Sequence, residues 1–348
     1  MKKLLCFLLA LVSTITLCFT LTGCVFGGGA SLTYELLGDG TYAVTGITKS
    51  GQKVVIPASY NGAEVTEIAE DAFRNKTSIK EVVLPETVRK LQNSAFAGAK
   101  GLEKINLEKV EVLGKYVFQD AFVKAPKVEI KLSSIMSIGN KCFENAAGLK
   151  KVTVGGTLNT IPKLAFSSCS GLKTIVLGNK VRTLEEKAFT GCSSLSDITL
   201  DSIKYIGEEC FNGCGALTEL NMPSIEEIKD RAFNNCGFIT TITCGPNIKQ
   251  LFPLAFYSCA SLTTFTLTNP VASEWCYAMV NANTSTARIT DADSCQGAAY
   301  KHLLNDPTGF ATRIKSGGFN TSSCWVTKTW VEEHGLKVGS TYAHTVFS

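Results

Sequence analysis

Hydrophobic residues along this chain repeat with a period of 22 or 23 residues, and a phenylalanine marks every copy of the repeat. The nine phenylalanines are Phe73, Phe96, Phe118, Phe143, Phe166, Phe189, Phe211, Phe233 and Phe256. Only the interval after Phe118 is longer, because two or three residues are added around Lys124 to Lys131. A fixed period of this length is the signature of stacked structural repeats.

Two branched apolar columns accompany the phenylalanine in each copy. The first, eight residues before it, comprises Val65, Val88, Val110, Ile135, Leu158, Val181, Ile203, Ile225 and Ile248. The second, five residues before it, comprises Ile68, Leu91, Leu113, Ile138, Ile161, Leu184, Ile206, Ile228 and Leu251. A small residue directly precedes the phenylalanine, and further apolar residues follow it by six, nine and eleven positions, as in Leu172, Ile175 and Leu177.

This spacing predicts an α/β repeat, with a short strand and a helical turn in each 22–23-residue rung. Positions nine and eleven are two residues apart, so both side chains of a strand there point to the same buried face. The segment from Glu185 to Cys192, around Phe189, predicts the helical turn. One rung cannot bury its apolar face alone, because ordering it costs about 1–2 kcal/mol per residue in backbone entropy. Stacking makes the core continuous, so we expect a solenoid.

The strand positions between the buried ones form the candidate binding face. Side chains eight and ten residues after each phenylalanine must point outward. In the central and later copies these are Lys151, Thr153, Thr174, Val176, Asp197, Thr199, Glu219, Asn221, Thr241, Thr243, Thr264 and Thr266. Threonine also suits exposed strands without any function. The functional alternative is a polar surface that binds a protein or a glycan through many weak contacts, although the absence of an aromatic side chain argues against a glycan.

The first residues indicate export. Lys2 and Lys3 precede an apolar stretch and small residues, so residues 1–23 are typical of a signal peptide. Leu21-Thr22-Gly23-Cys24 resembles a bacterial lipobox, which implies that Cys24 is the lipid-bearing first residue of the mature protein. The alternative is an ordinary signal peptide with a chance cysteine. Residues 24–30 are rich in glycine and predict a flexible tether. We therefore expect an extracytoplasmic protein anchored to the bacterial cell membrane.

Charge and histidine content argue against other functions. The full chain carries a net charge of +4, and losing Lys2 and Lys3 leaves +2, which gives no case for a nucleic-acid partner. The three histidines, His302, His334 and His344, all follow the repeats, and no nucleotide-binding or hydrolase motif is present. Cys324 and His334 could form a thiolate pair, but no flanking signature supports one. We expect no catalytic residue, no cofactor and no metal site.

Fourteen cysteines in an exported chain invite a disulfide interpretation. Five of them, however, occupy one column three residues after the phenylalanine: Cys169, Cys192, Cys214, Cys236 and Cys259. Earlier copies place Ala99, Ala121 and Ala146 there, so the column favours a small buried side chain. One sulfur per rung also argues against zinc, which needs four ligands around a point. A disulfide among Cys276, Cys295 and Cys324 remains open.

The repeat resembles the BspA-like leucine-rich-repeat family, whose pattern runs V-x-x-I-x-x-x-A-F-x-x-C-x-x-L-x-x-I-x-L. The resemblance covers nine copies over residues 65–268, and the third copy departs from it, with Val128 and Ile130 out of register. The Asp-Gly at Asp39 and Gly40 predicts a hairpin. The resemblance implies that residues 31–64 form an N-terminal β cap. Residues 269–309, with a short helix expected over 294–305, are predicted to close the array, and residues 310–348 match no repeat.

The resemblance implies a surface protein that mediates adhesion or protein binding, and we expect it to be a monomer. Two alternatives remain: a solute-binding lipoprotein of a transporter, and a passive stalk that presents residues 310–348. The first needs two lobes around a cleft, which a single-period array does not predict. An exported hydrolase lacks a residue set for the chemistry. Fold alone does not determine function, so the repeat predicts a binding surface and not a particular ligand.

Overall fold

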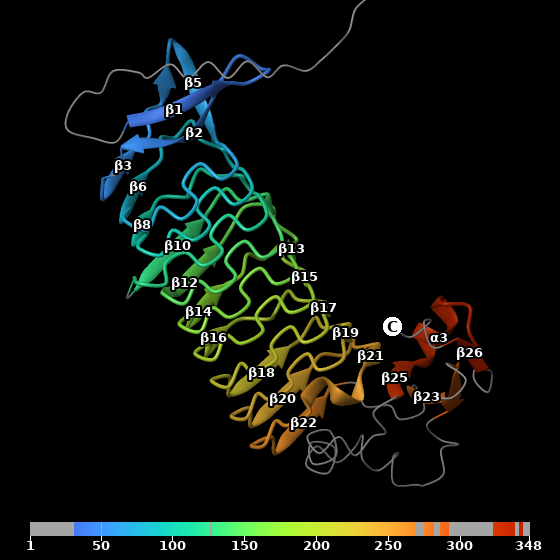
Figure 1. Ribbon diagram of the computed structural model, residues 1–348. Coiled ribbons are helices and arrows are strands. Elements are labelled where there is room, and N and C mark those ends of the chain that lie inside the picture. The colour runs from blue at the N-terminus through green and yellow to red at the C-terminus, as the bar shows by residue number, and fades with distance from the viewer. Residues whose placement is uncertain are drawn as a thin grey trace, which may run out of the picture.

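The computed structural model describes residues 31–49, 51–125, 127–268, 275–281, 286–291, 323–337 and 341–343. The predicted signal peptide, Cys24, the tether and the helix expected over 294–305 lie outside these residues. The described chain winds into rungs that stack along one axis, from an N-terminal hairpin to a group of C-terminal strands (Figure 1). The strands pair from rung to rung, and the fold is therefore a β-solenoid.

The strands that follow each phenylalanine, together with one strand that precedes Phe73, line one side of the solenoid and are called the front ladder (Figure 1). Their pairing is parallel, in three sheets of the described chain ordered β3-β6-β8, β10-β12-β14-β16 and β18-β20-β22. They are β3 (Lys53–Val55), β6 (Glu81–Val83), β8 (Lys104–Ile105), β10 (Val128–Leu132), β12 (Leu149–Val154), β14 (Thr174–Val176), β16 (Asp197–Ile198), β18 (Glu219–Met222), β20 (Thr241–Cys244) and β22 (Thr264–Leu267).

A second set of parallel strands, the back ladder, precedes each phenylalanine and lines the other side (Figure 1). The sequence pattern did not predict it, because most of its strands are only two residues long and show no period. They are β5 (Ala63–Ile68), β7 (Lys90–Leu91), β9 (Val112–Leu113), β11 (Ser137–Ile138), β13 (Thr160–Ile161), β15 (Thr183–Leu184), β17 (Tyr205–Ile206), β19 (Glu227–Ile228) and β21 (Gln250–Leu251). In each strand the column five residues before the phenylalanine is buried.

The structure corrects the expectation of a helical turn in every rung. The segment around the phenylalanine consists of tight turns, and among the described residues of the solenoid only Pro253–Phe256 (η1), in the ninth rung, is helical, as a 3-10 turn. The reason is the direction of the hydrogen bonds. The phenylalanine N–H donates to a carbonyl of the next rung, as from Phe166 to Ala188 at 2.8 Å. An N–H used between rungs cannot close the bond to the fourth preceding residue that an α-helix requires.

Left-handed backbone at two places bends the chain around each phenylalanine. Two residues after it, φ is positive in all nine rungs, at Asn75, Gly98, Asp120, Asn145, Ser168, Gly191, Gly213, Asn235 and Ser258. Glycine and asparagine tolerate this region best. Two residues before it, φ is positive in eight rungs, even at Leu164 (59°). These kinks interrupt any helix and return the chain to the core.

The core is a continuous column of stacked phenylalanine rings. All nine rings are fully buried, and successive centroids lie 5.0–5.5 Å apart with nearly parallel planes. Offset stacking of this kind contributes about 0.5–1.5 kcal/mol per pair beyond area burial. Each rung therefore stabilises both of its neighbours, as expected for a solenoid.

The cysteine column is buried and free of disulfides, as predicted. Each thiol donates a hydrogen bond to the carbonyl oxygen of the preceding rung's phenylalanine, as Cys192 Sγ does to Phe166 at 3.1 Å. The same bond, at 3.0–3.1 Å, recurs from Cys169, Cys214, Cys236 and Cys259. Burial raises the pKa of these thiols, for Cys259 to about 12. The side chains of Cys276, Cys295 and Cys324 are outside the described part, so a disulfide among them stays a prediction.

The departure predicted in the third rung is confirmed. Phe122, an added residue with φ of 60°, is fully buried and lies against Phe118, with ring centroids 5.3 Å apart. The pairing of β10 with β12 then shifts register between Val128 and Glu129. The insertion thus supplies one more core ring before the repeat resumes.

Additional strands extend the back ladder at both ends. The predicted hairpin is present as β1 (Ser31–Leu36) and β2 (Tyr42–Lys49), and β2 pairs with β5, which also pairs with β4 (Ser59–Tyr60). At the other end β25 (Ser323–Thr327) pairs antiparallel with β21. This last sheet also contains β23 (Trp275–Asn281), β24 (Thr286–Asp291) and β26 (Thr341–Ala343), and α3 (Lys328–Glu333) follows β25. Part of the segment that matched no repeat therefore joins the solenoid directly.

Candidate binding face

The twelve predicted binding residues all lie on the outer side of the front ladder. Eleven belong to β12, β14, β16, β18, β20 and β22, and Thr199 directly follows β16. Lys151, Val176, Asp197, Thr199, Glu219 and Asn221 are exposed, and the remaining six, all threonines, are half-buried. The residues between them, such as Val152, Ile175 and Ile242, are buried in the core. The alternation of a strand thus places these twelve residues, here named the ribbon, at the surface.

The strand register gathers the ribbon into two patches. In one, Lys151 lies beside Thr174, which lies beside Asp197. In the other, Glu219, Thr241 and Thr264 form a second such row. Adjacent strands are about 4.8 Å apart, so each row is a flat line of closely spaced side chains. The structure therefore brings the predicted residues together, within sheets β12-β14-β16 and β18-β20-β22.

Ribbon side chains have no partners within the described part of the chain. None of the twelve side chains forms a hydrogen bond or ion pair with another described residue. The adjacent column differs, because Thr240 Oγ1 donates to the Thr218 carbonyl at 3.2 Å and Thr263 Oγ1 to the Thr240 carbonyl at 3.1 Å. The ribbon hydroxyl, amide and charged groups are therefore available to an external ligand.

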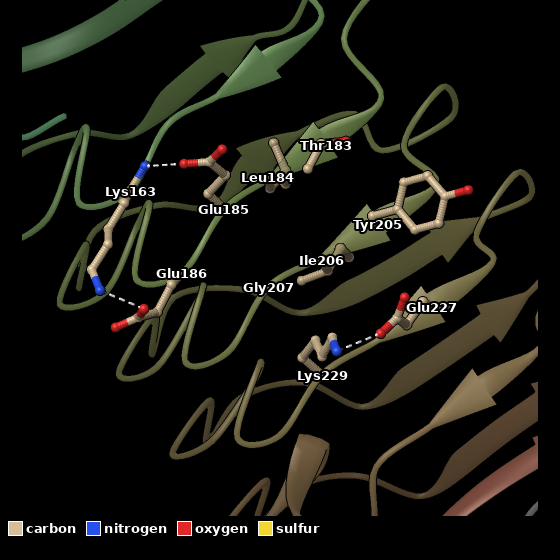
Figure 2. A pocket seen from close by; sticks show the side chains of 10 residues that line it. All are labelled: Lys163, Thr183, Leu184, Glu185, Glu186, Tyr205, Ile206, Gly207, Glu227 and Lys229. Carbon is tan, nitrogen blue, oxygen red and sulfur yellow. Dashed lines mark hydrogen bonds and ion pairs between the residues drawn. The ribbon is translucent and has the colours of Figure 1, made fainter. Parts of the chain in front are cut away.

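The back ladder carries a groove that sequence reasoning missed (Figure 2). It has a volume of about 340 Å³ and is lined by Lys163, Thr183, Leu184, Glu185, Glu186, Tyr205, Ile206, Gly207, Glu227 and Lys229. Glu185, Gly207 and Lys229 occupy the same position in three successive rungs, four residues before the phenylalanine. Gly207 has no side chain, so the groove opens between its two larger neighbours. A glycine flanked by charged residues in one column is the signal that could have revealed it.

Gly207 is required by packing as well. A Cβ atom there would lie 2.6 Å from the Glu186 backbone nitrogen, which is closer than van der Waals contact allows. The same column holds Gly114 and Gly139, where a Cβ would lie 2.8 Å and 2.4 Å from backbone nitrogens of the preceding rung. The hollow is thus a consequence of close approach between rungs.

The charged groups of the groove are satisfied by one another. Lys163 forms an ion pair with Glu186, and Lys229 forms one with Glu227 at 2.9 Å (Figure 2). The hydrogen bond from Lys163 lowers the pKa of Glu186. Tyr205 donates its hydroxyl to Glu226 at 3.1 Å, and desolvation raises the pKa of Tyr205. The groove therefore presents few free polar groups to a ligand, unlike the ribbon.

Neither face assembles recognisable catalytic chemistry. Within the described residues no group of three or more histidine, cysteine or acidic side chains is placed to hold a metal ion. The buried thiols of the cysteine column are held neutral and are inaccessible. None of the helices in the described part is both long and apolar enough to cross a bilayer. The ribbon and the groove offer hydrogen-bonding and charged groups.

Comparison with known proteins identifies the repeat. The BspA type leucine rich repeat region matches in six copies, over residues 50–172, 113–224 and 194–302. No functionally curated protein matches.

Similar solved structures include leucine-rich-repeat proteins of bacteria. A leucine rich cell surface protein of Faecalibacterium prausnitzii is 15% identical, with 71% of this chain and 95% of that one covered and a TM-score of 0.34. The leucine-rich-repeat protein of T. pallidum is 22% identical, with 66% and 87% covered and a TM-score of 0.38. The pneumococcal vaccine antigen PcpA is 14% identical, with 72% and 94% covered and a TM-score of 0.36. The family match spans most of the chain, which therefore belongs to the BspA-type leucine-rich-repeat family.

Proposed function

We propose that this protein is an extracytoplasmic binding protein that holds a protein or glycan ligand on the ribbon of its front ladder. The observation that carries the proposal is that the ribbon side chains have no hydrogen-bond or ion-pair partner within the described chain. Twelve outward side chains in two flat patches have no partner in the described chain, while their neighbours in the strands form the core. A ligand can replace the water on these groups without disturbing a single interaction that stabilises the fold.

The proposed site distributes weak contacts over a wide surface. Each neutral hydrogen bond contributes about 0.5–1.5 kcal/mol net, so the affinity must come from several rungs together. Binding energy usually concentrates in a few central positions. We therefore place the centre at the sixth and seventh rungs, around Thr199 and Asn221.

The proposed location is the outer side of the cell membrane, with the solenoid attached through Cys24. The lipobox-like residues Leu21 to Cys24 support it, and Gly27 to Gly29 would separate the body from the lipid. Stable anchoring takes at least two acyl chains, which diacylation of one cysteine supplies. A solenoid held in this way presents its rungs to the surroundings of the cell.

Two matched variants test the binding face. Residues 31–348 are applied to protein and glycan arrays, and the ligands found are then tested with Thr199→Glu and Asn221→Glu combined. The control combines Ser170→Glu and Ser193→Glu, which adds the same charge at exposed turn positions of two rungs. We expect the ribbon variant to keep its melting temperature and to lose binding by tenfold or more, and the control to keep both.

Full binding by the ribbon variant would contradict the proposal and favour a stalk that presents the C-terminal residues. Deletion of residues 310–348 is a poor test of that alternative, because it removes β25 from the edge of β21. An exposed strand edge promotes aggregation, so the deletion would change more than recognition.

A further inference from the structure

Charges on the front ladder are distributed unevenly along the solenoid. In the first two rungs they pair with each other across the strands. Lys80 Nζ lies 3.0 Å from Glu103 Oε1, Lys53 Nζ 3.2 Å from Glu81 Oε2, and Lys104 Nζ 3.6 Å from Glu81 Oε1. Each of these three lysines and two glutamates therefore has an ion-pair partner.

The next three rungs are strongly positive. They carry five lysines on or directly before β10, β12 and β14, the green strands of Figure 1, and these residues form what we call the lysine patch: Lys127, Lys131, Lys150, Lys151 and Lys173. Four are exposed and Lys150 is half-buried. None of the five forms an ion pair within the described residues.

A single acidic residue, Glu129, lies among them on the same face. It stands opposite Lys151 in the β10–β12 register, without an ion pair. Five positive charges and one negative charge leave a net of four positive charges on three adjacent rungs. From the sixth rung onward the front strands carry no lysine or arginine at all, only Asp197, Glu219 and neutral side chains.

This accumulation works against folding. Lys150 and Lys173 occupy the same position in successive rungs, and the Lys173 N–H donates to the Lys150 carbonyl at 3.0 Å. Strands at this spacing bring side chains within about 4.5–5.5 Å, where like charges repel each other. The first two rungs show that the same positions accept paired charges. Positions that break a local rule without a structural gain are typical of functional sites.

We propose that the lysine patch binds an anionic polysaccharide, which deepens and rests on the function proposed above. The patch is a flat, open array of charges about 4.8 Å apart from rung to rung, which suits a linear polymer with repeated sulfate or carboxylate groups. Lysine offers mobile point charges, without the rigid bidentate fork with which arginine recognises one phosphate or carboxylate. The outward positions of these strands carry no aromatic side chain, so the stacking platform that single-stranded nucleic acid needs is absent. The same absence argues against a neutral glycan, whereas a polysaccharide held through its anionic groups does not need stacking.

Binding of heparin, measured by biolayer interferometry with the soluble body, tests this inference, and neutral dextran serves as the uncharged probe. The patch variant combines Lys131→Gln, Lys151→Gln and Lys173→Gln. Its matched control combines Lys49→Gln, Lys109→Gln and Lys115→Gln, which removes the same charge from exposed lysines that also lack ion pairs in the described chain and lie off the front ladder. Wild type and control should bind heparin and not dextran, and the patch variant should bind at least tenfold more weakly.

Two further measurements sharpen the result. Heparin binding should weaken as salt rises, because exposed charges are screened within about 8 Å at physiological ionic strength. The patch variant should melt no lower than wild type, since it loses only repulsion. Equal weakening of the patch and control variants, or absence of heparin binding by wild type, overturns the inference. Tighter binding to phosphatidylglycerol vesicles than to heparin overturns it too, in favour of a membrane surface.

The experiments distinguish a failure of polysaccharide binding from a failure of the binding function proposed for the ribbon. An array ligand that is lost on changing Thr199 and Asn221, together with no response to the lysine changes, refutes the polysaccharide and leaves the binding function in place. Absence of any array ligand and of heparin binding refutes both.

Discussion

Single side chains in this solenoid contact the equivalent side chains of the rungs before and after, so that equivalent residues form columns along the axis. Phe166 stacks on Phe143 and Phe189, with ring centroids 5.1 Å and 5.4 Å away. Its backbone N–H bonds to Ala188 of the following rung, and its carbonyl accepts the Cys192 thiol. The loss of one ring therefore affects three rungs.

We predict that Phe166→Ala lowers the free energy of unfolding by about 3–5 kcal/mol, as other deep cavity-forming substitutions do. Thr174→Ala, on the outward side of β14, should change it by no more than about 0.5 kcal/mol. Denaturant titration of both variants measures the difference. Similar effects of the two substitutions would show that the assignment of inward and outward positions is wrong.

The buried thiols predict a specific pH dependence. Burial raises their pKa above the value of about 8.5 in an unfolded chain. The neutral thiol is therefore favoured by folding, and this stability is fully present below that value. It is lost as pH rises toward the folded pKa, at about 1.4 kcal/mol per pH unit for each thiol.

Unfolding free energies measured from pH 7 to pH 10.5 should thus fall steeply above about pH 8.5. A variant with alanine at Cys169, Cys192, Cys214, Cys236 and Cys259, the residue that earlier rungs use there, should decline less. Parallel pH profiles for the two proteins would mean that the cysteine column does not titrate on unfolding.

At the scale of the element, each rung is made of two short strands joined by kinked turns. The strands are too short to be stable alone, and their hydrogen bonds all go to adjacent rungs. Close approach between rungs therefore contributes to the stability of the fold, as the residues within a rung do. Gly207 is the clearest example, since the backbone of Glu185 and Glu186 lies against it.

Gly207→Ala should destabilise the protein by about 1–3 kcal/mol, the usual cost of overpacking, and should narrow the groove on the back ladder. Gly215→Ala is the matched control, because a Cβ atom there meets nothing within 4 Å. Its effect should stay within about 0.5 kcal/mol. Thermal melts of the two variants decide the matter, and an unaffected Gly207→Ala protein would refute the close packing of the rungs.

At the scale of the whole molecule, different parts of the solenoid stabilise the fold, extend its sheets and carry the exposed polar surface. The phenylalanine column stabilises it, the back ladder is extended by β1 and β2 at one end and by β25 at the other, and the front ladder carries the free polar surface. The ion pair of Lys249 with Glu333, at 3.0 Å, also ties α3 to the last rungs. Because β25 pairs with β21, the back ladder has no open edge at β21.

Anchoring also belongs to this scale, and Cys24→Ser tests it. Without the thiol no lipid can be attached, so the variant should leave the membrane fraction or keep its signal peptide unprocessed. Phase partitioning in detergent and the mass of the mature protein measure the change. Unaltered partitioning of the variant into the detergent phase would contradict the lipid anchor.

The sequence by itself determined the repeat, the buried columns, the outward positions of the front ladder and the free thiols. All of these depend on the spacing of residue types within one rung, and a column recurring every 22 or 23 residues is visible without coordinates. The ribbon from Lys151 to Thr266 was predictable for the same reason, since the alternation of a strand decides which side chains face outward. The BspA-type family was identifiable from these columns too.

Tertiary structure alone decided the features that depend on contacts between rungs. The phenylalanine N–H could have closed a helix, and only stacking directs it to the next rung and converts the predicted helical turn into kinked turns. The back ladder consists of strands too short to show a period, and the groove needs Glu185, Gly207 and Lys229 side by side. Likewise, the unpaired state of the lysine patch depends on which charges meet across strands that are more than twenty residues apart in the sequence. Hydrogen bonds and ion pairs of this range are set by the register of the stack, and no local pattern encodes that register.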